Sequence, residues 1–250
     1  MSCTIRVTHA QLLGDRENQE DALGLSSPAD FDAKGLLALL SDGMGGMERG
    51  EVYSSMAVNA MLEAFAAAPA DSDPGQGLRR MYAHLRQRAG TLRHGDSPED
   101  GGATLVAALV RDDMLTFLSV GDSCIDLYRG GGLIRLNRPQ TVGVKLDERA
   151  ALGYIPAESA VMYSYRSALT NHVNATKAGP CDMCSSPIRL LPGDRILLSS
   201  DGLGGALTDP EIAAILATTE DAAHALISAA ASLRKPRQDN ASAVVLDILP

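Results

Sequence analysis

Acidic residues at the ends of apolar segments are the first candidates for chemistry in this sequence. Asp42 and Asp201 each follow an apolar run closely and are each followed by glycine, and Asp122 lies two residues beyond a third run. A rigid strand holds a carboxylate in place, and a neighbouring glycine lets backbone and ligand approach closely. Other acids stand at polar breaks in the chain, and the candidates together are Glu20, Asp21, Asp42, Asp122, Asp201 and Asp239.

Oxygen ligands of this kind favour hard divalent cations. Mg²⁺ and Mn²⁺ prefer carboxylate, carbonyl and water oxygens, and clustered carboxylates repel one another strongly unless a cation lies among them. Two such ions about 3.5–4 Å apart form a common site for phosphoester hydrolysis by water. Arg16 stands five residues before Asp21 in the same polar turn, and its planar guanidinium suits a phosphate. The spacing therefore makes metal-dependent phosphoester hydrolysis a candidate function.

Composition narrows the class of protein. The 250 residues are 45% hydrophobic and 21% charged, which is typical of a globular chain, and the net charge of −9 argues against a general nucleic-acid binder. The N-terminus has no apolar run of signal-peptide length, and no stretch approaches 18 uninterrupted apolar residues. We therefore expect no membrane span and a cytoplasmic location. Four cysteines are too few for a disulfide scaffold.

Ten segments have the composition of strands. Those between residues 104 and 136 are joined by connections of hairpin length, so they are expected to pair in antiparallel fashion. The strand predictions are residues 5–13, 22–26, 36–41, 104–110, 115–120, 125–128, 133–136, 188–190, 194–200 and 241–249.

Helical spacing of apolar residues predicts four helices, at residues 51–68, 78–92, 210–217 and 221–234. The third has a start signal, because Thr208 is a capping residue and is followed by Pro210 and Glu211. Residues 139–186 are polar and weakly periodic, which indicates an insertion or lid. Without a linker or internal repeat, residues 1–250 are expected to form one domain.

Seven short motifs, taken in order, resemble the PP2C-type (PPM) metal-dependent serine/threonine phosphatases in their bacterial form. The resemblance extends over nearly the whole chain, and a segment ending in RSALT at Thr170 is similar to the flap of that family. The motifs are RENQED at 16–21, DGMGG at 42–46, GE at 50–51, GAT at 102–104, GDS at 121–123, DGL at 201–203 and DNAS at 239–242.

The resemblance implies an α+β fold: a four-layer αββα sandwich of two antiparallel sheets flanked by pairs of helices, with a flap at about residues 139–186. It implies that Asp42 bridges two Mn²⁺ or Mg²⁺ ions. Asp201 and Asp239 would complete one ion site, and Glu20 and the Gly43 carbonyl would serve the other.

The implied reaction is hydrolysis of phosphoserine or phosphothreonine in proteins by a water that bridges the two ions. Asp21 would orient that water, Arg16 would hold the substrate phosphate, and no phosphoenzyme would form. A phosphoprotein substrate, and a Ser/Thr kinase that opposes the enzyme, are the implied partners. The sequence does not indicate an oligomeric state.

Four positions depart from the family pattern. Gly205 replaces an acid that helps many bacterial relatives to hold a third metal, so a third site at Asp122 is expected to be weak or absent. Cys124 replaces an arginine, Ala103 replaces a threonine, and Met44 stands where animal members have a histidine. None of these changes removes a core ligand.

Two alternative functions stay open at this point: a catalytically silent binding module that keeps the fold, which Gly205 and Cys124 motivate, and a hydrolase of small phosphate esters. Cys181 and Cys184 have the spacing of half a zinc site or of a redox pair, but no second cysteine pair or nearby histidine completes the motif. Ordinary or redox-sensitive thiols are the simpler interpretation.

Overall fold

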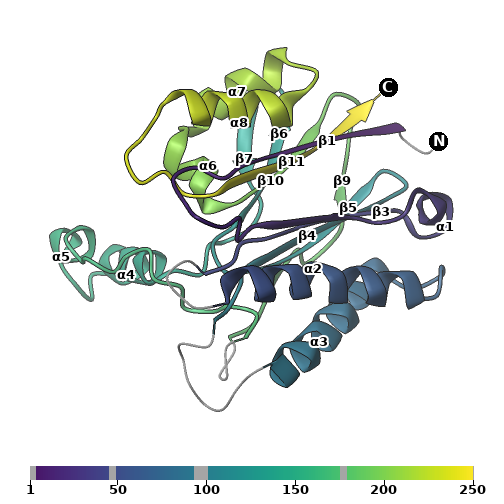
Figure 1. Cartoon of the computed structure of the whole chain (residues 1–250), viewed down its shortest axis with the longest axis horizontal. Helices are drawn as coiled ribbons and strands as arrows, with labels where there is room; N and C mark the ends of the chain where they lie inside the picture. The colour runs from purple at the N-terminus through teal and green to yellow at the C-terminus, as the bar shows by residue number, and fades with distance from the viewer. Residues whose placement is uncertain (1–3, 45–48, 93–100, 175–178, 250) are drawn as a thin grey trace.

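Two antiparallel sheets stack on one another in the computed structural model, which describes residues 4–44, 49–92, 101–174 and 179–249 (Figure 1). The first sheet has the order β1 (Thr4–Leu12), β11 (Ala241–Leu249), β10 (Arg195–Ser199), β6 (Cys124–Arg129) and β7 (Gly132–Arg135). The second has the order β2 (Ala22–Leu25), β3 (Leu36–Ser41), β4 (Leu105–Arg111), β5 (Met114–Val120) and β8 (Asp182–Met183), with β9 (Ile188–Arg189) also paired to β5. The antiparallel pairing predicted from the short connections is confirmed.

Strand β3 shows why several strands read as continuous apolar runs. Its even-numbered residues, such as Leu36 and Leu40, pack in the core between the two sheets. Its odd-numbered residues, Leu37 and Leu39, face the opposite way and pack against helices. Because side chains alternate across a sheet, a strand covered on both faces needs apolar residues at every position.

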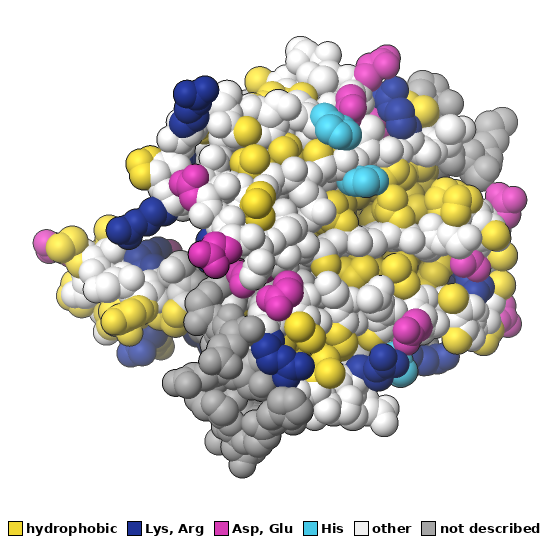
Figure 2. Space-filling model, in the orientation of Figure 1, with side chains coloured by type: hydrophobic (Ala, Val, Ile, Leu, Met, Phe, Trp, Pro, Cys, Tyr) yellow, Lys and Arg dark blue, Asp and Glu magenta, His cyan; other side chains and the backbone are white. Residues whose placement is uncertain are grey.

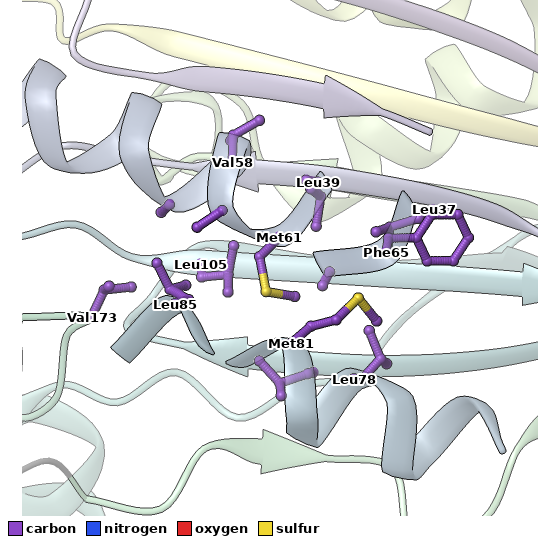
Figure 3. Close-up of a cluster of buried hydrophobic side chains, with 14 of the residues drawn as sticks. Leu37, Leu39, Val58, Met61, Phe65, Leu78, Met81, Leu85, Leu105 and Val173 are labelled. Carbon is purple, nitrogen blue, oxygen red and sulfur yellow. The ribbon is translucent and has the colours of Figure 1, made fainter. Parts of the chain in front are cut away.

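Helices α2 (Gly50–Ala67) and α3 (Pro74–Leu92) cover the outer face of the second sheet. Met61 of α2 and Met81 of α3 lie in one buried cluster with Leu39 and Leu105 of the sheet (Figure 3). The outer face of the first sheet is covered by α6 (Asp201–Ala206), α7 (Asp209–Thr218) and α8 (Ala222–Ser232). These layers confirm the predicted αββα sandwich.

Two of the helices that cover the sheets differ from prediction. Helix α3 begins at Pro74, four residues earlier than its apolar pattern predicted, because Asp73 Oδ1 accepts a hydrogen bond from the Gln76 N–H (2.8 Å) and caps it. Helix α6 was not predicted, since its six residues include three glycines and are too short to show a period. It gives the first sheet three covering helices instead of the predicted two.

The predicted insertion contains more regular structure than its sequence pattern indicated. It forms α4 (Val142–Ala151), α5 (Ala157–Val161) and the strand β8, and the two helices project from the side of the sandwich (Figure 1). Few of their side chains are buried, and α5, with five residues, is too short to show a helical period. A short helix, α1 (Phe31–Lys34), was not predicted either.

None of the helices in the described part of the chain combines the length and the apolar character that crossing a bilayer requires. The organisation of residues 1–250 as one domain stays a prediction.

Candidate active site

Six of the residues singled out in the sequence line one cavity of about 240 Å³. They come from segments that are as far as 223 positions apart in the chain, and they are Arg16, Asp42, Gly43, Asp122, Asp201 and Asp239. Met44, Thr104 and the flap residues Ser167, Ala168 and Leu169 complete the lining.

Strand ends deliver the carboxylates to this cavity. Asp42 directly follows β3, Asp201 begins α6 just beyond the end of β10, and Asp239 lies two residues before β11. Each acid is therefore attached to a buried strand of the sandwich, and the two stacked sheets hold these strand ends at one place. The sequence pattern of a strand followed closely by a carboxylate predicted this placement for Asp42 and Asp201, but not for Asp239, which precedes its strand.

The backbone of Asp42 is held by Thr104, which the sequence reasoning did not include among the site residues. The Asp42 N–H donates to Thr104 Oγ1 (3.0 Å), and the Thr104 N–H donates to the Asp42 carbonyl (2.8 Å). Thr104 Oγ1 also shares a hydrogen bond with Ser123 Oγ (2.6 Å), and both side chains are buried. This network connects the end of β3 to the residues that directly precede β4 and β6.

Gly43 lies where three segments approach each other closely. Its N–H donates to the Glu20 carbonyl (3.1 Å), and it forms an isolated β-bridge with Ala103. A Cβ at this position would lie 2.5 Å from the Gly50 carbonyl carbon and 2.7 Å from the Glu20 carbonyl oxygen. Only glycine therefore fits here. Gly45 and Gly46 of the same motif lie outside the described residues.

Glu20 and Asp21 flank the cavity without lining it. Asp21 is buried, and its Oδ2 accepts hydrogen bonds from Ser200 Oγ (2.8 Å) and Ser242 Oγ (2.6 Å). Its Oδ1 is buried with no hydrogen-bond partner. The two serines were also missed; their signal was adjacency, since Ser200 precedes Asp201 and Ser242 closes the DNAS motif.

Arg16 pairs with acids of the cavity. Its Nη2 donates to Asp239 Oδ2 (2.6 Å), and its Nη1 lies 4.0 Å from Glu20 Oε2. The hydrogen bond to Asp239 raises the pKa of the Arg16 guanidinium above its usual value. The arginine that was predicted to hold a phosphate is thus engaged with two of the predicted metal ligands.

Burial makes the negative charge of the cavity unfavourable. It raises the pKa of Asp21 to about 6 and that of Asp122 to about 7, and neighbouring carboxylates such as Asp201 add to both shifts. Burial also raises the pKa of Asp42 and of Asp201, whose carboxyls share a hydrogen bond with each other. A group of carboxylates with this property is stabilised by a bound cation.

The donor set fits Mg²⁺ or Mn²⁺, because every candidate ligand is an oxygen and Asp21 Oδ1 lacks a partner. As it stands, however, no group of three His, Cys, Asp or Glu side chains in the described residues is arranged to hold a metal ion. The Arg16–Asp239 pair explains part of this difference, since it occupies an oxygen of one predicted ligand. A metal ion bound to Asp239 Oδ2 would compete with Arg16 for that oxygen.

The cysteines add no ligand set to the described part of the chain. Cys124, Cys181 and Cys184 are free thiols, and Cys184 Sγ accepts a hydrogen bond from the Phe117 N–H (3.3 Å). Burial raises the pKa of Cys124 to about 12, so this thiol stays protonated at neutral pH.

The sequence model of the family described as "Protein phosphatase 2C" matches residues 13–238. The chain belongs to this family. The family members reported below are similar to this chain both in sequence and in structure.

The serine/threonine protein phosphatase PstP of Mycobacterium tuberculosis is 32% identical over 241 residues, which are 94% of this chain and 43% of PstP. The chain thus spans less than half the length of this relative. A crystal structure of the same M. tuberculosis phosphatase has 28% identity and a TM-score of 0.79, covering 98% of this chain and 99% of that one. The catalytic domain of PstP in complex with two manganese ions has 27% identity and a TM-score of 0.78, covering 98% and 99%.

Proposed function

We propose that this chain hydrolyses phosphoserine and phosphothreonine monoesters of proteins and requires two Mn²⁺ or Mg²⁺ ions. The observation that carries the proposal is the meeting of four carboxylates from four separate segments, with an arginine, in one cavity: Asp42, Asp122, Asp201, Asp239 and Arg16. Membership of the protein phosphatase 2C family supports the choice of reaction, and the manganese complex of PstP supports the choice of ion.

Each acid has a proposed place around the ions. Asp42 would contact both, Asp201 and Asp239 would bind one, and Glu20 with the Gly43 carbonyl would bind the other. Bound divalent ions supply a nucleophilic water at neutral pH and neutralise charge on the phosphoryl oxygens. A third ion at Asp122 would be weak or absent, because Gly205 offers no side-chain oxygen.

Two residues would act on the substrate and the attacking water. Asp21 Oδ2 is held by two serine hydroxyls, which leaves the unpartnered Oδ1 to accept a hydrogen bond from water. Arg16 would exchange Asp239 for the substrate phosphate, whose oxygens match the planar guanidinium. The reaction would proceed by direct attack of water on phosphorus.

The test is hydrolysis of p-nitrophenyl phosphate and of a phosphothreonine peptide by purified protein with Mn²⁺. Activity should disappear with EDTA and in Asp42→Asn, whereas Asp32→Asn, in the short helix α1, should behave as the unchanged protein. Absence of turnover on every substrate, together with no Mn²⁺ binding in calorimetry, would favour the silent binding module. A higher kcat/KM for metabolites than for phosphopeptides would favour the small-ester hydrolase.

Cytoplasmic location and opposition to a Ser/Thr kinase remain part of the same proposal. They follow from the proposed substrate class. Deleting or inhibiting candidate kinases and following the phosphorylation of shared substrates would test the second point.

A further inference from the structure

A basic loop connects α8 to β11, which is unusual in a chain with a net charge of −9. Its basic residues Arg234, Lys235 and Arg237 are all exposed, and the loop also contains Asp239 of the active-site cavity. Figure 1 shows this connection at the upper left of the molecule, and Figure 2 shows Lys and Arg side chains both there and lower on the same edge, where the flap helices lie. Neither arginine guanidinium has a hydrogen-bond or ion-pair partner within the described residues.

Both arginines have an unfavourable backbone conformation. The φ angle is +45° at Arg234 and +57° at Arg237, in the left-handed region that side chains other than Gly, Asn and Asp rarely adopt. Among the described non-glycine residues, only Asp112, in a hairpin turn, has the same property. Local strain of this kind is common at binding sites, and glycine would serve the backbone better here.

Hydrogen bonds hold the loop in this conformation. The Asp15 N–H donates to the Gln238 carbonyl (2.8 Å), and the Gln238 N–H donates to Asp15 Oδ2 (3.0 Å). Lys235 Nζ donates to the Gly205 carbonyl (2.6 Å) at the end of α6, and Gln238 Nε2 donates to the Ala230 carbonyl (2.9 Å). The loop is therefore ordered while its two guanidinium groups stay available.

The loop adjoins the proposed active site. Asp15 and Gln238, which pair with each other, immediately precede Arg16 and Asp239, which line the active-site cavity. On the loop side, a surface hollow of about 400 Å³ is lined by Arg234, Lys235, Asp15 and Gln238, among others. The two linings are therefore joined by consecutive residues, 15–16 and 238–239, and an extended substrate segment that entered the cavity could continue towards the hollow at about 3.3 Å per residue.

We propose that Arg234 and Arg237 bind acidic side chains of the substrate segment that flanks the phosphorylated residue. This inference rests on the proposed phosphatase function and names its substrate class: phosphoproteins with Asp or Glu close to the phosphorylated serine or threonine. Guanidinium groups pair with carboxylates through two parallel hydrogen bonds, which favours arginine at such a site.

The test compares two phosphothreonine peptides of equal length, one with Asp and Glu beside the phosphothreonine and one with Asn and Gln there. For the unchanged chain we expect KM to be about fivefold to tenfold lower for the acidic peptide, with similar kcat, because two exposed charge pairs each contribute about two- to fourfold. In 1 M NaCl, where the Debye length is about 3 Å, the difference should vanish.

The decisive variant carries Arg234→Gly and Arg237→Gly together, because glycine keeps the positive φ while the charge is lost. Its KM for the acidic peptide should rise to that for the neutral peptide, and its midpoint of thermal unfolding should be unchanged or raised. The control pairs Arg80→Gln with Arg88→Gln on α3, which removes two positive charges elsewhere and should preserve the preference.

Two further readouts separate this inference from the proposed function. Hydrolysis of p-nitrophenyl phosphate, which cannot reach the loop, should be equal in all three proteins, and its absence would count against the phosphatase function alone. Fluorescence anisotropy with the labelled acidic peptide reports on the loop whether or not turnover occurs. Equal binding and equal KM for the two peptides, or an acidic preference that survives in the glycine variant, would overturn the proposal.

Discussion

Arg16 illustrates how one residue serves two electrostatic partners. In the structure it neutralises Asp239, and its distance from Glu20 Oε2 is 4.0 Å, so it stands among the oxygens that are proposed to bind metal. A cation bound at Asp239 would compete with this ion pair. The freed guanidinium would then be available for a substrate phosphate, which would couple the proposed metal and substrate sites.

Replacing Arg16 therefore has two opposite expected effects. In Arg16→Ala, Mn²⁺ affinity measured by calorimetry on the metal-free chain should increase about two- to fivefold, since a half-exposed ion pair no longer competes. The kcat/KM for a phosphopeptide should decrease about 10²-fold, because a donor to the phosphoryl group is lost. Arg16→Lys should keep the weaker metal affinity, and a loss of Mn²⁺ affinity in Arg16→Ala would contradict the competition.

A second prediction about single residues concerns the serines that donate hydrogen bonds to Asp21. Ser242→Ala removes a buried hydrogen bond to a carboxylate, and we expect a loss of about 1.5–3 kcal/mol in the free energy of unfolding measured with urea. Ser232→Ala, on an exposed position of α8, should change that energy by less than about 0.5 kcal/mol. Equal effects of the two substitutions would show that the Ser242–Asp21 contact contributes nothing.

Among the secondary-structure elements, helix α6 contains Gly205, one of the positions that depart from the family pattern. Asp201 and Gly205 are four residues apart on this helix, so they lie on the same face. A Cβ at Gly205 would meet no heavy atom within 4 Å, and therefore the backbone leaves room for a side chain. The missing acid reflects the sequence, not a steric obstacle.

Gly205→Asp should restore a ligand beside Asp201 and Asp122. We expect calorimetry to detect one additional Mn²⁺ per chain in this variant. Gly204→Asp adds the same charge on a different face of the helix, again with open space around the Cβ, and should add no ion. If both variants bind the same number of ions as the unchanged chain, Asp122 has no role in metal binding.

At the scale of the whole molecule, the two sheets bring carboxylates together at the active-site cavity, where their negative charges repel one another. For a carboxyl whose pKa is higher in the folded chain than in the unfolded chain, folding is most stable at low pH and loses stability as pH rises towards the folded pKa. Asp21 and Asp122 have folded pKa values of about 6 and about 7, well above the ordinary value of 3.8.

The metal-free chain should accordingly lose stability as pH rises from about 4 to about 7, by several kcal/mol if both shifts are fully expressed. Differential scanning calorimetry across this range measures the effect, with saturating Mn²⁺ as the comparison. Manganese should raise the unfolding temperature most at the upper end of the range, where the carboxylates are ionised. A metal-free chain whose stability is constant from pH 4 to 7 would exclude the repulsion.

Local patterns in the sequence determined the strands and helices that pack against a core. Strand β3 was predicted at its observed bounds because a strand covered on both faces must be apolar throughout, and the motifs ending in Asp42 and Asp201 pointed to one oxygen-lined site. Helices α5 and α6 were missed because five or six residues are too few to show a helical period. Helix α4, which buries little surface, and the first turn of α3 were missed as well.

Only the tertiary structure decided how the site is supported and neutralised. Which hydroxyls hold Asp21, that Thr104 fixes the backbone of Asp42, and that Arg16 lies against Asp239 all depend on contacts between segments as far as 223 positions apart. The proposed role of the exposed arginines in the α8–β11 connection likewise depends on the fold, because the fold places that loop beside the cavity. Residue types and spacing identify what a site contains, whereas the stacking of the two sheets determines which of those groups touch.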